Sequence, residues 1–117
     1  MRKVLVVDDE FLVRVGIKSF LNWEENGYTI IGEAADGKQA LEIMERELPD
    51  VVLTDLKMDG MDGFELIQVS RKRFPSVQFV VLSSFEDGEN VKRAMKLGAA
   101  DYIFKLTSKP DELLRIL

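Results

Sequence analysis

The sequence predicts one α/β domain, a parallel sheet of five strands with helices on both faces. Short apolar runs that end in polar residues alternate with segments whose apolar residues recur every three or four positions. Five such strand-then-helix units fit into 117 residues, and an apolar fraction of 46% is enough to build a core. Parallel strands joined through helices require right-handed crossovers, so both faces of the sheet should be covered.

Composition narrows the functions that the chain can have. The net charge of −5 argues against direct binding to nucleic acid or to an anionic membrane, because both need a concentrated basic surface. No apolar run approaches the roughly 18 residues of a membrane span, so we expect a cytoplasmic location. Since Cys and His are absent, a nucleophile must be Ser, Thr, Lys, Tyr or a carboxylate.

The first unit pairs a strand that has an acidic tip with an amphipathic helix. Residues 3–7 are an apolar run that ends in Asp8-Asp9-Glu10. Residues 11–21 then follow a helical period. The inward stripe of this helix contains Val13, Ile17, Phe20 and Leu21. Residues 22–27 carry the chain back across the sheet.

The second unit has a less buried strand. Residues 28–34 alternate only partly between apolar and polar side chains, which suits a strand at the edge of the sheet. Asp36 and Gly37 open the helix that follows, and Pro49 stops it. The core side of this helix is predicted to be Leu41, Met44 and Leu48.

The third unit contains the strand that should be most deeply buried. Residues 51–55 read Val-Val-Leu-Thr-Asp, a run that is typical of a strand covered on both faces. The strand ends in Asp55, residues 56–63 form a loop, and Asp62 is suited to cap a third helix that Pro75 ends. The inward side chains of that helix are expected to be Phe64, Ile67 and Phe74.

The last two units complete the sheet. Residues 77–83 form a strand that closes on Ser83, and the next helix should end just before Gly98. The inner stripe of that helix is expected to be Val91, Ala94 and Met95. Residues 101–104 form a fifth strand, which ends in Lys105. A fifth helix is indicated by Pro110, Leu113, Leu114 and Leu117. The sequence stops inside it without a capping signal, so we expect that this helix is truncated, in a chain cut from a longer protein, or that it is frayed.

These units predict a flavodoxin-like (βα)5 three-layer sandwich with the strands in the order 2-1-3-4-5. In this order strands one, three, four and five are neighbours. Open α/β sheets bind ligands outside the carboxyl ends of their strands, so the residues at these four ends should meet in one crevice. Those residues are Asp8 and Asp9, Asp55, Ser83 and Lys105.

Such a cluster of carboxylates predicts a cation site. Carboxylates that are close together repel one another unless a cation neutralises them or some take up protons. Mg²⁺ suits the site because it binds one or two carboxylates and substrate oxygens while it keeps several waters. Asp55 could then act as a nucleophile toward phosphorus, with Ser83 and Lys105 contacting phosphoryl oxygens. Taken singly, each residue could instead be structural, as an N-capping acid, a turn former or an ion-pair partner.

In order and spacing, these residues resemble the receiver domains of bacterial two-component response regulators. The resemblance covers essentially the whole chain. It is carried by Val6-Val7-Asp8-Asp9-Glu10, residues 53–58, Met61-Asp62-Gly63, Leu82-Ser83-Ser84 and residues 98–105. It implies that Asp55 is the phosphoacceptor, that Ser83 is a switch hydroxyl and that Lys105 is the phosphate partner.

The same resemblance implies a Mg²⁺ site and an aromatic switch. Asp9 and Asp55 would bind Mg²⁺ directly, and Asp8 would act largely through water. The backbone carbonyl of Lys57 would complete the protein ligands. Tyr102 would be the aromatic residue whose rotamer follows Ser83; the alternative is that this tyrosine only packs on a short strand.

Two positions depart from the family pattern. Leu106 replaces the Pro that often follows the lysine. Because a non-proline cis bond costs about 2.5–4 kcal/mol, we expect the bond between Lys105 and Leu106 to be trans. Asp59 also replaces a common Pro, which makes the loop less rigid and adds a carboxylate near the metal.

The resemblance implies a phosphorylation-dependent switch that acts on no substrate other than its own aspartyl phosphate. A sensor histidine kinase would supply the phosphoryl group, and the added charge would reshape the face of helix four, strand five and helix five. A homodimer could form through the same face. Residues 1–117 would form the receiver domain. The output domain, absent from this chain, would be a DNA-binding transcription regulator, and residues 22–27 and Lys105-Leu106 look like those of receivers that precede AraC-type domains.

Three other functions fit parts of the pattern. A Mg²⁺-dependent phosphatase with an aspartyl nucleophile would carry Asp-x-Asp after the first strand, whereas the acids here are adjacent. A nucleotide or flavin binder would carry a glycine-rich phosphate loop after a strand, and the sequence has none. A degenerate receiver that served only for dimerisation would not need the full set of acids, Ser and Lys.

Overall fold

One parallel sheet forms the centre of the molecule. The computed structural model describes residues 1–84, 87–104 and 114–117. Within these residues the strands lie in the order β2-β1-β3-β4-β5, and every neighbouring pair is parallel, which confirms the predicted sheet. The strands are β1 (Arg2–Val7), β2 (Tyr28–Ala34), β3 (Val51–Asp55), β4 (Gln78–Ser83) and β5 (Asp101–Phe104).

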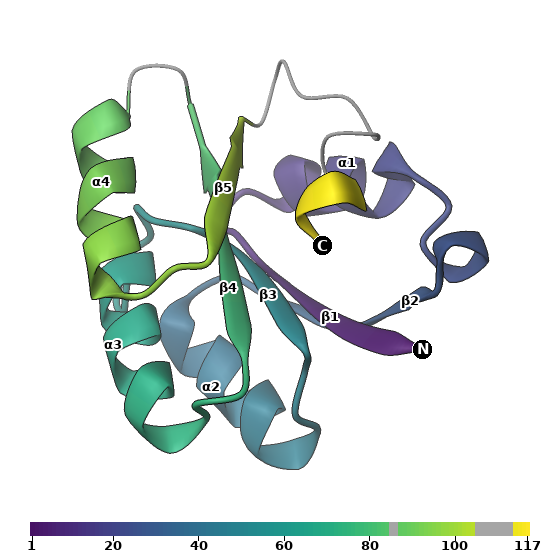
Figure 1. The fold of residues 1–117 in the computed structure, drawn as a ribbon, viewed down its shortest axis with the longest axis horizontal. Helices are drawn as coiled ribbons and strands as arrows, with labels where there is room; N and C mark the ends of the chain where they lie inside the picture. Colours follow the sequence, from purple (N-terminus) through teal and green to yellow (C-terminus); the bar gives the residue numbers. More distant parts are fainter. Residues whose placement is uncertain (85–86, 105–113) are drawn as a thin grey trace.

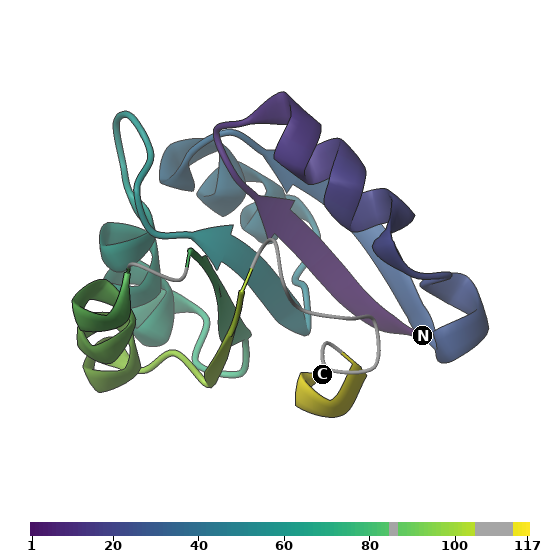
Figure 2. The same cartoon turned by 90° about the horizontal axis from the view of Figure 1, so that it is seen from above.

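Helices cover both faces of the sheet, as Figures 1 and 2 show. One face is packed by α2 (Gly37–Arg46), α3 (Gly63–Arg73) and α4 (Gly88–Leu97), and the other by α1 (Phe11–Phe20). Residues 114–116 are also helical, and they pack on the same side as α1. Pro110 and Leu113, which indicated the start of a fifth helix, lie outside the described residues.

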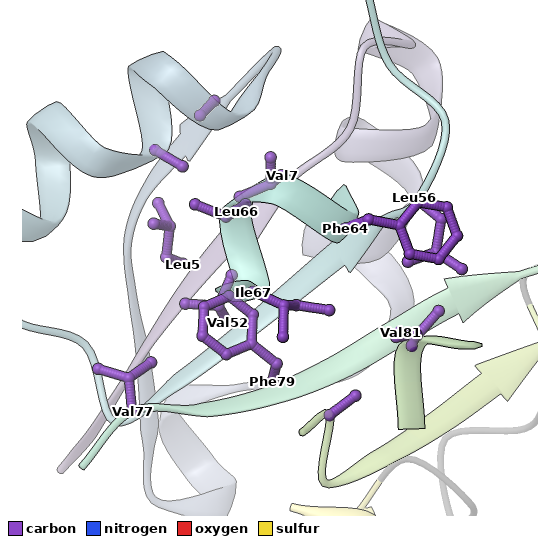
Figure 3. Close-up of a cluster of buried hydrophobic side chains, with 14 of the residues drawn as sticks. Leu5, Val7, Val52, Leu56, Phe64, Leu66, Ile67, Val77, Phe79 and Val81 are labelled. Atoms are coloured by element: carbon purple, nitrogen blue, oxygen red, sulfur yellow. The ribbon is translucent and has the colours of Figure 1, made fainter. Parts of the chain in front are cut away.

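The two cores follow from the alternation of side chains along the strands. In β1, Leu5 and Val7 point to the side of α2 and α3, whereas Val4 and Val6 point to the side of α1. The first core is shown in Figure 3, where Phe79 of β4 lies among side chains of α3. Every residue of β3 is buried, which confirms the prediction of a strand that is covered on both faces.

The predicted helix ends are formed by the expected groups. The Asp36 side chain accepts a hydrogen bond from Gln39 N at 2.9 Å, and the Asp62 side chain accepts one from Glu65 N at 3.0 Å. Both carboxylates thus satisfy amide groups that the first helical turn leaves without a partner. Gly98 ends α4 with a φ of 116°, a value that only glycine adopts readily.

Two residues that were predicted to be inside are exposed. Leu48 is 44% exposed because α2 ends at Arg46, so the helical stripe does not continue to position 48. Met95 is 38% exposed. The inward line of α4 advances in steps of three, through Val91, Ala94 and Leu97, and this leaves Met95 on the flank of the helix.

The connection between α1 and β2 is more ordered than the sequence indicated. Residues Glu24–Asn26 form a 3₁₀ turn, and Trp23 before it is buried. The Trp23 indole donates from Nε1 to the carbonyl of Ile17 at 3.1 Å, and its ring meets Tyr28 edge-on. Trp23 therefore joins the core on the α1 side.

Among the described helices, none combines the length and the apolar character that spanning a lipid bilayer requires.

Candidate functional site

Three aspartates lie together at the carboxyl edge of the sheet. Val7 of β1 pairs with Thr54 of β3, so Asp8, which follows β1, and Asp55, the last residue of β3, lie side by side. One carboxylate oxygen from each of Asp8, Asp9 and Asp55 lies within 4.8 Å of the other two. Asp8 and Asp55 are buried and Asp9 is exposed, so the cluster opens to solvent at Asp9.

The side chain of Asp55 is held by its own backbone surroundings. Its Oδ1 atom accepts a hydrogen bond from Leu56 N at 2.7 Å, and the Thr54 hydroxyl donates to the Asp55 carbonyl at 2.8 Å. Gly63, the first residue of α3, lies directly against this segment, and a Cβ atom there would come within 2.8 Å of Leu56 Cα. The start of α3 therefore restricts the position of Asp55.

The acidic turn after β1 is held from several sides. Asp8 N donates to Ala34 O of β2 at 3.0 Å, and Asp8 Oδ1 accepts from Glu10 N at 2.9 Å. The Arg14 side chain donates to the carbonyl oxygen of Asp8 at 2.6 Å. Arg14 was not predicted to belong to the site, because in the sequence it is only a polar residue on the flank of an amphipathic helix.

Ser83 and Tyr102 lie on the next two strands of the sheet. Ser83 ends β4 and is buried, and its Oγ atom has no hydrogen-bond partner in the described part of the chain. Tyr102 is partly exposed on β5, and its ring meets Phe104 edge-on with centroids 5.6 Å apart. The placement of both residues agrees with the expected order of strands, and their roles in switching stay predictions.

The remaining residues of the predicted site are only partly covered by the structure. Lys105 and Leu106 lie outside the described residues, so the phosphate partner and the predicted trans bond stay predictions. The side chain of Lys57 is exposed and forms an ion pair with Asp87 at 3.6 Å. A surface depression of about 420 Å³ is lined by Asp9, Lys57, Met58, Asp59 and Asp62, so Asp59 borders the same depression as the exposed acid of the cluster.

The cluster has the donor set that Mg²⁺ prefers. All three side chains offer carboxylate oxygens, and two of them are buried, where mutual repulsion is least screened by water. Asp9 leaves one side open to solvent, as a hard cation that keeps some of its waters requires. The residues present therefore fit a Mg²⁺ ion.

Comparison with known protein families gives one match over nearly the whole chain. The model of the response regulator receiver domain matches residues 4–117. Among solved structures, the chain is similar to the receiver domain of AraT from Geobacillus stearothermophilus, with a TM-score of 0.86 and 33% identity over 97% of this chain and 87% of that one. It is also similar to the receiver domain of NtrX from Brucella abortus, with a TM-score of 0.85 and 29% identity over 97% of this chain and 92% of that one.

Curated relatives are longer than this chain. An uncharacterised transcriptional regulatory protein of Bacillus subtilis, YesN, is 44% identical over 90% of this chain, which spans 28% of that protein. The response regulator protein VraR of Staphylococcus epidermidis is 42% identical over 93% of this chain, which spans 52% of it. The chain thus covers about half or less of the length of these relatives.

Proposed function

The chain belongs to the response regulator receiver domain family, and we propose that it is a signalling switch that accepts a phosphoryl group on Asp55 from a sensor histidine kinase. Receiver domains are signalling modules of two-component systems. The observation that supports Asp55 as the acceptor is its place in the cluster, buried at the end of β3 within 4.8 Å of two further carboxylates.

Phosphoryl transfer to Asp55 needs a nucleophile in a set position. The Asp55 carboxylate would bond to phosphorus while the phosphorus–nitrogen bond of the kinase phosphohistidine breaks, and the released imidazole nitrogen would take up a proton. The hydrogen bond from Leu56 N and the close contact of Gly63 with this segment restrict the carboxylate beforehand. Such pre-positioning lowers the entropy cost of in-line attack.

Mg²⁺ is part of this proposal. Asp9 and Asp55 would bind the ion directly, Asp8 would act through water, and the carbonyl of Lys57 would be the remaining protein ligand. When bound, Mg²⁺ would offset the negative charge of the carboxylates and of the incoming phosphoryl group. The three carboxylates would hold the ion, and the solvent side of the cluster, at Asp9, would stay open to the donor.

The switch would run from Asp55 to the neighbouring strands. Ser83, buried and without a hydrogen-bond partner among the described residues, would donate its hydroxyl to a phosphoryl oxygen. Lys105 would pair with another oxygen, and Tyr102 would change rotamer as Ser83 moves. The phosphoryl group adds about −1.5 to −2 charges, enough to shift a balance between two existing conformations.

The readout would involve the face of α4 and β5. Met95 of α4 and Tyr102 of β5 are large side chains that stay exposed on these two elements, which supports their use in a homodimer or in contact with an output domain. Response regulators carry output domains, and one that binds DNA, as in a transcription regulator, is our proposal for the full protein. Residues 1–117 would form its receiver domain, and exchange of phosphate with a kinase would take place in the cytoplasm.

Exposure to a small phosphodonor tests the proposed function. Incubation of the chain with Mg²⁺ and acetyl phosphate should add one phosphate per molecule, as measured by intact mass spectrometry, and hydroxylamine should remove it. Asp55→Asn should take up none, while its far-ultraviolet circular dichroism stays that of the wild type. Absence of uptake by the folded wild type would contradict the proposal, and sustained hydrolysis of a generic phosphate ester would favour the alternative of a phosphatase.

A further inference from the structure

We propose that Arg14 of α1 is a positioning residue for the carboxylate cluster, and that with Glu33 of β2 it sets the affinity of the cluster for Mg²⁺. The inference rests on the proposed function, because it concerns how the same site is organised. Figure 2 shows α1 along the sheet, and the Arg14 side chain connects this helix to both β2 and the acidic turn.

The contacts of Arg14 divide between the acidic turn and β2. Its Nη1 atom donates to Asp8 O at 2.6 Å, and its Nε atom donates to Glu33 Oε1 at 2.8 Å. The side chain is largely buried, and its guanidinium carbon lies 5.6 Å from the centre of the Phe11 ring, a cation–π contact. These contacts leave Arg14 little rotamer freedom.

The bond to Asp8 O acts on the position of Asp9. The Asp8 carbonyl belongs to the peptide that joins Asp8 to Asp9, so a donor on this oxygen fixes the plane of that peptide. Asp9 is exposed, so surrounding side chains restrict it less than they restrict the buried Asp8 and Asp55. The direction of the Asp9 side chain therefore depends on its backbone, and the backbone depends on Arg14.

A guanidinium is suited to this bridge. It presents several N–H groups in a rigid plane and can bond to Asp8 O and Glu33 at once, whereas lysine is a single flexible donor centre. Glu33 also accepts a hydrogen bond from Lys18 Nζ at 2.5 Å. Lys18 contacts Glu33 at the oxygen that Arg14 does not use, which makes it a natural control.

Arg14 should affect Mg²⁺ affinity in two opposite ways, through its charge and through its hydrogen bond. Its positive charge alone would repel Mg²⁺, so removing the charge would tighten binding. Its hydrogen bond organises Asp9, so removing the bond would weaken binding. We expect the second effect to be the larger, because mutation of partners that orient metal ligands commonly changes metal affinity about 10–100-fold.

The experiment compares Mg²⁺ binding among variants by isothermal titration calorimetry of the 117-residue chain. Arg14→Lys, which keeps the charge, and Arg14→Gln, which does not, should both weaken Mg²⁺ binding about tenfold. Glu33→Gln should weaken it less, and Lys18→Gln should bind as the wild type does. In NMR spectra of the metal-free protein, the chemical shift of the Asp9 backbone amide should change in both Arg14 variants. It should be unchanged in Lys18→Gln.

A second measurement separates positioning from a loss of folding. At saturating Mg²⁺ the Arg14 variants should take up phosphate from acetyl phosphate at nearly the wild-type rate, with only the half-saturating Mg²⁺ concentration raised. Tighter or unchanged Mg²⁺ binding in folded Arg14→Gln would overturn the inference. If both Arg14 variants fail to fold, Glu33→Gln decides, and wild-type affinity in that variant would overturn it equally.

The outcomes also separate this inference from the proposed function. A wild type that binds Mg²⁺ and takes up phosphate, alongside Arg14 variants with unchanged affinity, would remove only the role of Arg14. A wild type that neither binds Mg²⁺ nor takes up phosphate would remove the proposed function and this inference with it.

Discussion

At the scale of single residues, the site depends on backbone contacts as much as on its acids. Asp55 is held by Leu56 N, and the Asp8–Asp9 peptide by the Arg14 side chain. Gly63 belongs to the same set, because only a residue without a side chain lets the first turn of α3 lie against the Asp55–Leu56 backbone. Small residues and remote donors thus place the reactive carboxylates.

Replacing Gly63 tests this contact. In Gly63→Ala the new Cβ would lie 2.8 Å from Leu56 Cα and closer still to the Asp55 carbonyl oxygen, so the backbone must shift. We expect the free energy of unfolding to fall by about 1–3 kcal/mol, as is usual for overpacking, and phosphate uptake to slow. Urea denaturation followed by Trp23 fluorescence measures the first effect.

Gly88→Ala is the matched control for Gly63→Ala. Gly88 also begins a helix, and no described atom lies within 4 Å of the Cβ that would be added there. The free energy of unfolding of Gly88→Ala should rise, by less than about 1 kcal/mol. Equal losses in the two variants would show that the contact of Gly63 with Asp55 is unimportant.

At the scale of elements, α1 and β2 are joined by an ion-pair network around Glu33. Hydrogen bonds from Lys18 and then Arg14, together with their charges, lower the pKa of the Glu33 carboxyl below its usual 4.5, although burial acts in the opposite direction. Because the carboxyl has a lower pKa in the folded state than in the unfolded state, its ionised form stabilises the fold. The network should therefore weaken in acid.

The pH dependence of stability tests the network. Since the pKa of Glu33 is lowered in the folded state, its contribution to the free energy of unfolding is fully present above about pH 4.5. This contribution is lost as the pH falls through the folded-state pKa. The difference in unfolding free energy between the wild type and Glu33→Gln should thus shrink below about pH 4.5, as urea titrations at several pH values would measure. In a Lys18→Gln background the difference should be smaller above about pH 4.5, where the Glu33 carboxyl is ionised. A difference that does not change with pH would contradict this account.

At the scale of the whole molecule, the acidic cluster couples cation binding to the stability of the fold. Three carboxylates with oxygens within 4.8 Å of one another repel in the folded chain, and this repulsion is relieved when the chain unfolds. A cation that binds only the folded state therefore stabilises the entire domain, by about 2.7 kcal/mol at a concentration 100 times the dissociation constant.

Thermal unfolding with and without Mg²⁺ measures this stabilisation. The melting temperature of the wild type should rise by several degrees in saturating Mg²⁺ and return when a chelator is added. The rise should be much smaller in Asp9→Asn, which lacks one proposed ligand. Glu42→Gln, on the exposed side of α2, should behave as the wild type does. An equal rise in Asp9→Asn would show that the ion binds elsewhere.

Most of the architecture could be predicted because it depends on local patterns in the sequence. The apolar run of β3, the capping carboxylates of Asp36 and Asp62 and the glycine at 98 each act within a few residues of themselves. The errors lie where neighbours in space decide burial. Leu48 lies beyond the end of α2 and Met95 lies on the flank of α4, whereas Trp23 is buried because Ile17 O and Tyr28 lie beside it in the fold.

The order of acids and strands along the chain was sufficient to locate the cluster of Asp8, Asp9 and Asp55, because parallel strands bring their carboxyl ends to one edge. The same order could not identify Arg14. Its two acceptors, Asp8 O and Glu33, are 6 and 19 residues away, on different elements. A contact of that kind exists only after α1 has packed along β1 and β2, because packing, and not sequence period, brings a side chain on one element within reach of two others.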